Sequence, residues 1–446
     1  MTKLLRQPLF WIVLAVTCCT TMPAPAEFPL KDGDVWVMAG DSITAQHLHS
    51  NYFEAFCFAR YPQLKFAFRN SGVGGHTIPS TLARFGYDIA AWKPTVVSVE
   101  LGMNDQGGAT TEKFVANMVT MLQRIRDIQA RPVIFSASPI NNGDTLAALG
   151  RNTRLHEYAT ALKPLAEKEG VPYADQFHAL VDVWGKNKPK ENLANALATL
   201  RTLSQDETLS GVEHLRAFLA AQEKSPTTGV ALQGDPVHLG PPGQLMMAAA
   251  LLKALGADGF VSSASLNAAG KLNEAKGCTI DQIKAEGGRL EFDRLDQRLP
   301  FPLPDDGVAA LRLDPTILEL SQYTLKVTGL KDGSSYTLKL NGVPVLVAPA
   351  KTFEAGVNLT ALGTSAGSKQ VSPVVAQSRA ILGAVAAKEA LVSQWRGLSQ
   401  KAHADGAPAE LKEQLAALGK KVAEADEKIR KVARPQKLHC EISTTP

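Results

Sequence analysis

Between residues 34 and 177, short apolar runs alternate with longer stretches in which apolar residues recur at helical spacing. A continuous apolar run is typical of a strand that is buried on both faces of a parallel sheet. The expected strands are 35–39, 66–68, 96–101, 133–137 and 171–174, and helices are expected near 45–60, 80–92, 111–130, 153–169 and 243–255. This alternation predicts an α/β fold with a doubly wound parallel sheet and helices on both faces.

Residues 178–234 interrupt this alternation. They have helical periodicity at 192–203 and 212–222 and contain no further strand-like run. A long excursion of this kind can be a lid over a site or a helical insertion that braces the edge of the sheet. The sequence leaves both roles open.

From about residue 260 the pattern is that of antiparallel strands. The Asp332-Gly333 and Asn341-Gly342 pairs are preferred two-residue hairpin turns. They separate strand-like segments at 323–328, 336–340 and 343–347. We therefore expect an antiparallel meander, joined in one sheet by an earlier hairpin around Gly287-Gly288.

The C-terminal tail has a helical pattern. Its apolar residues step by four and three, as in a heptad repeat: Leu411, Leu415, Leu418, Val422, Ala425, Ile429 and Val432. We expect this helix to pair with one at about 371–402 in an intramolecular α-helical hairpin, in preference to a dimer zipper. The expected organisation is an α/β domain at 27–260, a β-rich region at 261–362 and the hairpin at 363–446.

The 446 residues exceed the size of one hydrophobic core, so more than one domain is expected. A hydrophobic content of 45% and a charged content of 20% are those of a globular protein, neither disordered nor membrane-embedded. The net charge is +4, and without Lys3 and Arg6 it would be 4 − 2 = +2. This small charge does not favour nucleic acid as a partner, and the sequence leaves the oligomeric state open.

Residues 1–26 have the pattern of a secretory signal peptide. A basic start precedes an apolar run at 9–16, and Ala24-Pro25-Ala26 is a small-residue cleavage site. The run is too short for stable membrane insertion, so we expect a secreted or periplasmic protein cleaved after Ala26. Cleavage would leave Cys57, Cys278 and Cys440, an odd and scattered set for which buried free thiols are expected.

Candidate chemistry lies where the expected strands end. Ser42, in Gly-Asp-Ser, follows the first strand, and ligands bind beyond the carboxyl ends of such strands. A serine hydroxyl needs a base to become a nucleophile. His238 is the candidate base, and Asp235, three residues earlier, can orient its imidazole. The backbone N–H groups of Ser42 and Gly75 and the amide of Asn104 are candidate donors for an oxyanion hole.

These residues resemble the SGNH (GDSL-like) hydrolase superfamily over residues 34–256. The match consists of Gly-Asp-Ser at 40–42, a glycine turn at 70–75, Gly-Met-Asn-Asp at 102–105 and Asp-Pro-Val-His at 235–238. The resemblance implies a flavodoxin-like sheet and ester hydrolysis through an acyl-serine, with no metal or cofactor. Ile43 and Leu239 stand where the family usually has Leu and Pro.

Two other motifs are rejected because the expected structure around them does not fit their chemistry. Residues 363–367 match the G-x-S-x-G nucleophile elbow, but an antiparallel region precedes them where the elbow requires a parallel core strand. His47 and His49 form a His-x-His pair, but residues two apart do not share a helical face and no third ligand clusters with them. For these histidines we expect packing or pocket lining.

The expected function is hydrolysis of a small-molecule or polysaccharide ester, with carbohydrate O-acetyl esters suggested by export and the added β-rich region. That substrate is an analogy. A lipase- or thioesterase-like action on other acyl groups stays open. A non-catalytic carbohydrate- or surface-binding protein on the same fold is the alternative from another class.

Overall fold

The structure is a computed structural model that describes residues 27–141, 150–187, 194–224, 229–363 and 370–445. The expected signal peptide and residues 364–367 of the rejected elbow motif lie outside these ranges. The first sheet has five parallel strands in the order β2-β1-β3-β4-β5, which is the flavodoxin-like order. These strands are β1 (Asp34–Gly40), β2 (Phe66–Gly72), β3 (Val96–Glu100), β4 (Arg131–Phe135) and β5 (Tyr173–Ala174). The expected α/β fold class is confirmed.

Helices cover both faces of this sheet because alternate strand residues point to opposite sides. Trp36 and Met38 of β1 belong to one apolar cluster, and Val37 and Ala39 belong to another. The first layer contains α2 (His49–Arg60), α7 (Gln176–Lys186) and α10 (Pro241–Ala254). The second contains α3 (Ile78–Ala83), α4 (Phe85–Asp88), α5 (Thr111–Asp127) and α6 (Thr153–Glu169).

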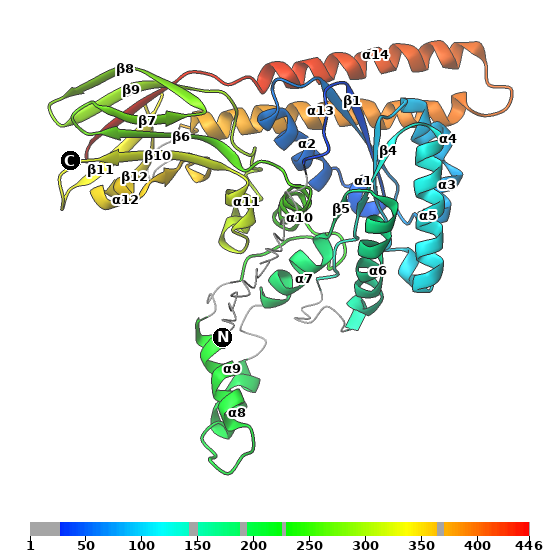
Figure 1. Cartoon of the computed structure of the whole chain (residues 1–446), viewed down its shortest axis with the longest axis horizontal. Helices are drawn as coiled ribbons and strands as arrows, with labels where there is room; N and C mark the ends of the chain where they lie inside the picture. Colours follow the sequence, from blue (N-terminus) through cyan, green and yellow to red (C-terminus); the bar gives the residue numbers. More distant parts are fainter. Residues whose placement is uncertain (1–26, 142–149, 188–193, 225–228, 364–369, 446) are drawn as a thin grey trace, which may run out of the picture.

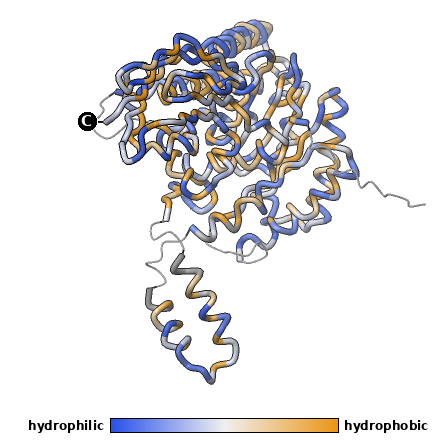
Figure 2. The backbone as a smooth tube through the Cα atoms, turned by 60° about the vertical axis from the view of Figure 1, so that its left-hand side comes forward, coloured by the Kyte–Doolittle hydropathy of each residue, from blue (hydrophilic) through white to orange (hydrophobic). Residues whose placement is uncertain are grey.

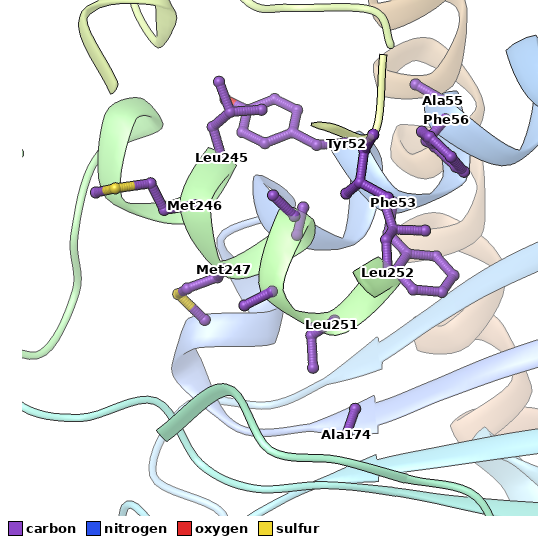
Figure 3. Packing of buried hydrophobic residues seen from close by; sticks show 14 of the residues in the cluster. Tyr52, Phe53, Ala55, Phe56, Ala174, Leu245, Met246, Met247, Leu251 and Leu252 are labelled. Carbon is purple, nitrogen blue, oxygen red and sulfur yellow. The ribbon is translucent and has the colours of Figure 1, made fainter. Parts of the chain in front are cut away.

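Helix α10 lies deep in the first layer. Its residues from Pro242 to Leu252 are buried on every side, so its sequence has no polar face. Leu245 and Leu252 lie close to Tyr52 and Phe53 of α2 (Figure 3). This packing holds the segment just before α10 against the end of the sheet.

The insertion contains helices, as predicted. Helices α8 (Ala194–Leu203) and α9 (Val212–Lys224) pack against each other. In both views the pair projects away from the body of the molecule (Figures 1 and 2). The pair therefore stands apart from the sheet that carries the candidate site.

The β-rich region differs from the expected single meander. It forms two sheets, in the orders β13-β10-β6-β7 and β12-β11-β14-β9-β8, which share one buried apolar cluster. The first contains β6 (Phe260–Asn267), β7 (Leu272–Lys276), β10 (Gln322–Thr328) and β13 (Val357–Asn358); the second contains β8 (Cys278–Glu286), β9 (Arg289–Asp296), β11 (Ser335–Leu340), β12 (Val343–Pro349) and β14 (Leu438–Thr444). Short helices α11 (Thr316–Glu319) and α12 (Ala350–Ala355) lie between strands. The turn at Gly333 links two sheets, since β10 pairs with β6 in parallel and not with β11.

The tail is a helical hairpin, but its last residues are not helical. Helices α13 (Pro373–Ala402) and α14 (Ala409–Val432) pack against each other and run beside the parallel sheet to the β-rich region (Figure 1). The expected helical tail at 363–446 is wrong for residues 438–444, because β14 pairs with β9 and β11 in the middle of the second sheet. Cys57, Cys278 and Cys440 are buried free thiols, as expected.

Candidate active site

The turn after β1 carries Ser42. Asp41 caps the short helix α1 (Ser42–Ala45), and its carboxylate accepts a hydrogen bond of 2.9 Å from the backbone N–H of Ile43. Glycine is required before this turn, since a Cβ on Gly40 would lie 2.0 Å from Thr44 Oγ1. Ser42 is the first residue of α1, where a backbone N–H has no acceptor within the helix.

The loop before α10 carries His238. Asp235 Oδ1 accepts hydrogen bonds from the backbone N–H groups of Val237 at 2.7 Å and His238 at 2.8 Å. Gln244 of α10 donates its amide to the carbonyl of Leu239 at 2.9 Å. These local bonds fix the direction in which the His238 ring leaves the chain.

Ser42, His238 and Asp235 form one hydrogen-bonded chain. His238 Nε2 lies 2.8 Å from Ser42 Oγ, and His238 Nδ1 lies 3.0 Å from Asp235 Oδ2. The hydrogen bonds from the backbone and ring of His238 lower the pKa of Asp235 to about 2. The side chains of His238 and Asp235 are 38% and 58% exposed, so the chain opens to solvent.

The other two predicted residues lie at the same edge of the sheet. Gly75 has a φ of +75° in an exposed turn after β2, and a Cβ on its neighbour Gly74 would be 3.9 Å from Ser42 Cβ. Asn104 Nδ2 donates to the carbonyl of His76 at 3.1 Å and approaches Asp41 Oδ2 at 3.4 Å. Burial raises the pKa of Asp41 to about 7, and the nearby charge of Glu100 adds to this rise.

A buried polar network lies behind this turn and was not found from the sequence. His49 Nε2 lies 2.8 Å from Glu100 Oε2, and His49 Nδ1 lies 3.0 Å from Gln244 Oε1. Burial opposes the charged ring, but Glu100 raises the pKa of His49 above its ordinary value. His47 instead lies 3.5 Å from Glu389 of α13. Both histidines face protein carboxylates, in line with the packing role expected for them.

A second group of residues that was not found from the sequence joins the site to helix α13. Arg84 donates to the carbonyl of Gly40 at 3.3 Å, and Arg396 of α13 donates to the carbonyl of Gly72 at 3.0 Å. Both guanidinium groups also bind Asp88. Burial opposes ionisation of Asp88, but the bonds and charges of the two arginines hold its pKa below the usual range. We call Arg84, Asp88 and Arg396 the arginine clamp.

The clamp had no detectable signal in the sequence. Arg396 is 308 positions from Asp88 and 324 from Gly72. The packing of α13 against the edge strand β2 and against α4 brings them together. Within the described part of the chain, no group of three or more His, Cys, Asp or Glu residues is arranged to hold a metal ion, and no helix is both long and apolar enough to span a membrane.

Residues 38–195 match the model of the GDSL-like Lipase/Acylhydrolase family. The match begins in β1 and includes the turn with Ser42, the glycine turn and the turn that carries Asn104. It ends before the Asp-Pro-Val-His segment. No curated protein matches the chain.

Among solved structures, a gut microbial diltiazem-metabolizing enzyme is 20% identical, with a TM-score of 0.69, and the match covers 94% of this chain and 99% of that one. It shares the fold across both regions. An acetylxylan esterase from Geobacillus stearothermophilus matches at 19% identity and a TM-score of 0.37, over 51% of this chain and 95% of that one. An α/β hydrolase from the Lake Arreo metagenome matches at 17% identity and a TM-score of 0.38, over 52% and 99%. Residues 38–195 therefore form a GDSL-like lipase/acylhydrolase domain, as in SGNH-type ester hydrolases.

Proposed function

We propose that this chain is a secreted serine esterase in which Ser42 is the nucleophile, His238 the general base and Asp235 the carboxylate that orients it. The observation that carries the proposal is the 2.8 Å separation of Ser42 Oγ and His238 Nε2. A hydroxyl becomes nucleophilic when a base at this distance accepts its proton in the transition state.

In the first half-reaction, Ser42 Oγ attacks the ester carbonyl carbon while its proton moves to His238 Nε2. The carbonyl oxygen becomes an oxyanion, which accepts hydrogen bonds from the N–H groups of Ser42 and Gly75 and from the Asn104 amide. One amide N–H of Asn104 leaves its 3.4 Å contact with Asp41 to make this bond. The bond to the leaving oxygen then breaks, and His238 returns the proton to the alcohol. Asp235 stabilises the imidazolium that exists between these two transfers.

In the second half-reaction, water attacks the acyl-serine and gives a proton to His238 Nε2. Collapse of the second oxyanion releases the carboxylic acid, and the proton returns to Ser42 Oγ. The same donors serve both oxyanions because the acyl carbon occupies the same place in each.

Labelling with a fluorophosphonate tests the nucleophile. The folded protein should form one covalent adduct on Ser42, located by mass spectrometry of its peptides. Ser42→Ala and the urea-unfolded protein should form none. An unlabelled folded protein would contradict the hydrolase mechanism and favour a carbohydrate- or surface-binding protein on the same fold.

The substrate we propose is a carbohydrate O-acetyl ester. The solvent-exposed His238 and Asp235 support this, because an ester on a large soluble molecule needs an open approach to the nucleophile. Nitrophenyl acetate should be hydrolysed with a higher kcat/KM than the butyrate or octanoate. A preference for the octanoate would favour a lipase, and one for acyl thioesters would favour a thioesterase.

The basic and apolar start of the chain supports export, with cleavage after Ala26. Expression of the full chain in a bacterial host should yield an exported protein whose N-terminal sequence begins at Glu27. A chain without residues 1–26 should stay inside the cells. An uncleaved, retained full chain would contradict the proposed localisation.

A further inference from the structure

A cavity of about 350 Å³ lies between the loop after β2, the α3–α4 segment and α13. Small-molecule sites commonly have volumes of roughly 300–1,000 Å³, so this cavity has room for one small polar group such as a monosaccharide unit. Its lining includes His76, Tyr87, Arg396 and Gln400. None of these residues has a part in the hydrolysis of the ester as described above.

The cavity lies beside the candidate active site. Its wall includes Val73 and His76, which flank the glycine turn with the proposed oxyanion donor Gly75. The backbone N–H of Val73 donates to the carbonyl of Gly40 at 3.2 Å, two residues before Ser42. A substrate with its ester at Ser42 therefore has this cavity next to it, along the edge strand β2.

The ionised groups of the cavity leave an excess of positive charge. Arg84 and Arg396 both line it, and the carboxylate between them is the single one of Asp88. Each oxygen of Asp88 already accepts from a guanidinium. A second anion would therefore find one uncompensated cation in this wall.

Among the described residues, hydrogen-bond donors also remain unused there. Each terminal nitrogen of Arg396 carries two N–H bonds, of which one donates to the carbonyl of Gly72 or to Asp88. His76 Nδ1 accepts from Arg84 Nε at 3.2 Å, which places the ring proton on Nε2. Guanidinium and imidazole N–H groups of this kind match the oxygens of a carboxylate.

We propose that this cavity binds the carboxylate of an acidic sugar, such as a hexuronate, next to the sugar that carries the ester. Arg396 and His76 Nε2 donate to the carboxylate, and Tyr87 and Gln400 face the ring. The inference rests on the proposed carbohydrate esterase function and narrows its substrate class to acetylated oligosaccharides that contain uronic acid.

Titration calorimetry with the full mature protein tests this directly. D-glucuronate should bind at least about tenfold more tightly than D-glucose, which lacks the charge, and than acetate, which lacks the ring. Glucuronate binding should weaken as salt is added. Equal binding of glucose, or no heat from glucuronate, would overturn the proposal.

A pair of variants on α13 locates the site. Gln400→Glu adds a carboxylate to the lining and should weaken glucuronate binding at least about tenfold through like-charge repulsion. Gln394→Glu adds the same charge at an exposed position of the same helix that is not part of the lining, and it should bind as the parent does. Equal weakening in both variants would overturn the proposed location.

Fluorophosphonate labelling keeps the two proposals separate. A protein that is labelled at Ser42 but binds no glucuronate would overturn the cavity assignment and keep the esterase. The opposite result is a protein that is not labelled at Ser42 but binds glucuronate, with weaker binding in Gln400→Glu. That result would support the cavity assignment and overturn the esterase proposal.

Discussion

Two segments of this chain have the same Asp-x-x-His pattern and the same local geometry. In one, Asp235 accepts from the backbone N–H of His238 at 2.8 Å and lies 3.0 Å from its Nδ1. In the other, Asp175 accepts from the backbone N–H of His178 at 3.1 Å and lies 2.7 Å from its Nδ1. In both segments the carboxylate fixes the ring by contacts within four residues.

The two segments differ in what the far nitrogen of the ring meets. His238 Nε2 lies 2.8 Å from Ser42 Oγ, whereas His178 Nε2 lies 2.9 Å from His156 Nδ1 on α6. The Ser42 hydroxyl can become a nucleophile when it gives its proton to His238. The imidazole of His156 can only share a hydrogen bond with His178. The local pattern therefore makes an oriented base, and the group placed opposite it decides its chemistry.

The largest expected loss of activity comes from removing the histidine ring in each of the two segments. His238→Ala should lower kcat for nitrophenyl acetate by about 10⁶-fold, because loss of the base removes the proton transfer. His178→Ala should leave kcat nearly unchanged. Steady-state kinetics of the two variants measures this, with circular dichroism as the control for folding. Similar losses in both variants would mean that His178 also acts in the reaction.

Replacing the carboxylate of the catalytic segment should lower kcat less than replacing its histidine. Asp235→Asn should lower kcat by about 10⁴-fold, because the amide can donate to Nδ1 and favour the tautomer whose Nε2 cannot accept a proton. The matched variant Asp175→Asn should keep the parent kcat.

The pH dependence of this effect follows from the pKa of Asp235, which is about 2 and below its ordinary value. The stabilising contribution of its charge is present above the ordinary carboxyl range and is lost as the pH falls through about 2. The carboxyl 13C chemical shift of Asp235 should therefore show no protonation step from pH 4 to pH 8. A protonation step of this carboxyl within that range would contradict the assigned ionisation.

Variants of the arginine clamp test whether it helps to hold Ser42 opposite His238. Arg396→Gln should lower kcat by about tenfold, since the carbonyl of Gly72 loses its donor and Asp88 loses one cation, and unfolding should become easier by about 1–3 kcal/mol. Arg396→Lys should recover part of the kcat because it keeps the charge. A less stable variant with the parent kcat would show that the clamp acts on stability alone.

The last expected effect is on stability and concerns Asp41, which precedes Ser42 and accepts a hydrogen bond from Asn104. Its folded pKa of about 7 exceeds the ordinary value, so the folded state holds a proton that the unfolded state has lost. Its contribution to the free energy of unfolding should fall as the pH rises from about 4 to about 7, by a few kcal/mol. Asp41→Asn cannot ionise and should show a flatter dependence in urea unfolding at each pH. An identical pH dependence in parent and variant would contradict a raised pKa.

Much of the α/β domain could be predicted from the sequence because its signals are local. Each of the five expected strands exists, and Ser42 follows β1 as its place after an apolar run indicated. The β-rich region was harder. A Gly-containing turn after β10 predicted a hairpin, but β10 pairs with a strand about 60 residues earlier, and no turn signal reports such a pairing. Residues 438–444 looked like the end of a helical tail because their partners lie about 100 to 150 positions away.

By itself, the sequence determined the strand and helix order of the α/β domain and the residues at the ends of its strands. It also determined the Asp-x-x-His segments, because hydrogen bonds within four residues orient each ring. Only the tertiary structure decided that His238 faces Ser42 while His178 faces His156. It also brought Arg396 from α13 to the strand that precedes the glycine turn. The physical reason is that the position of a side chain depends on local bonding, whereas the identity of its partner depends on packing between segments that are distant in the chain.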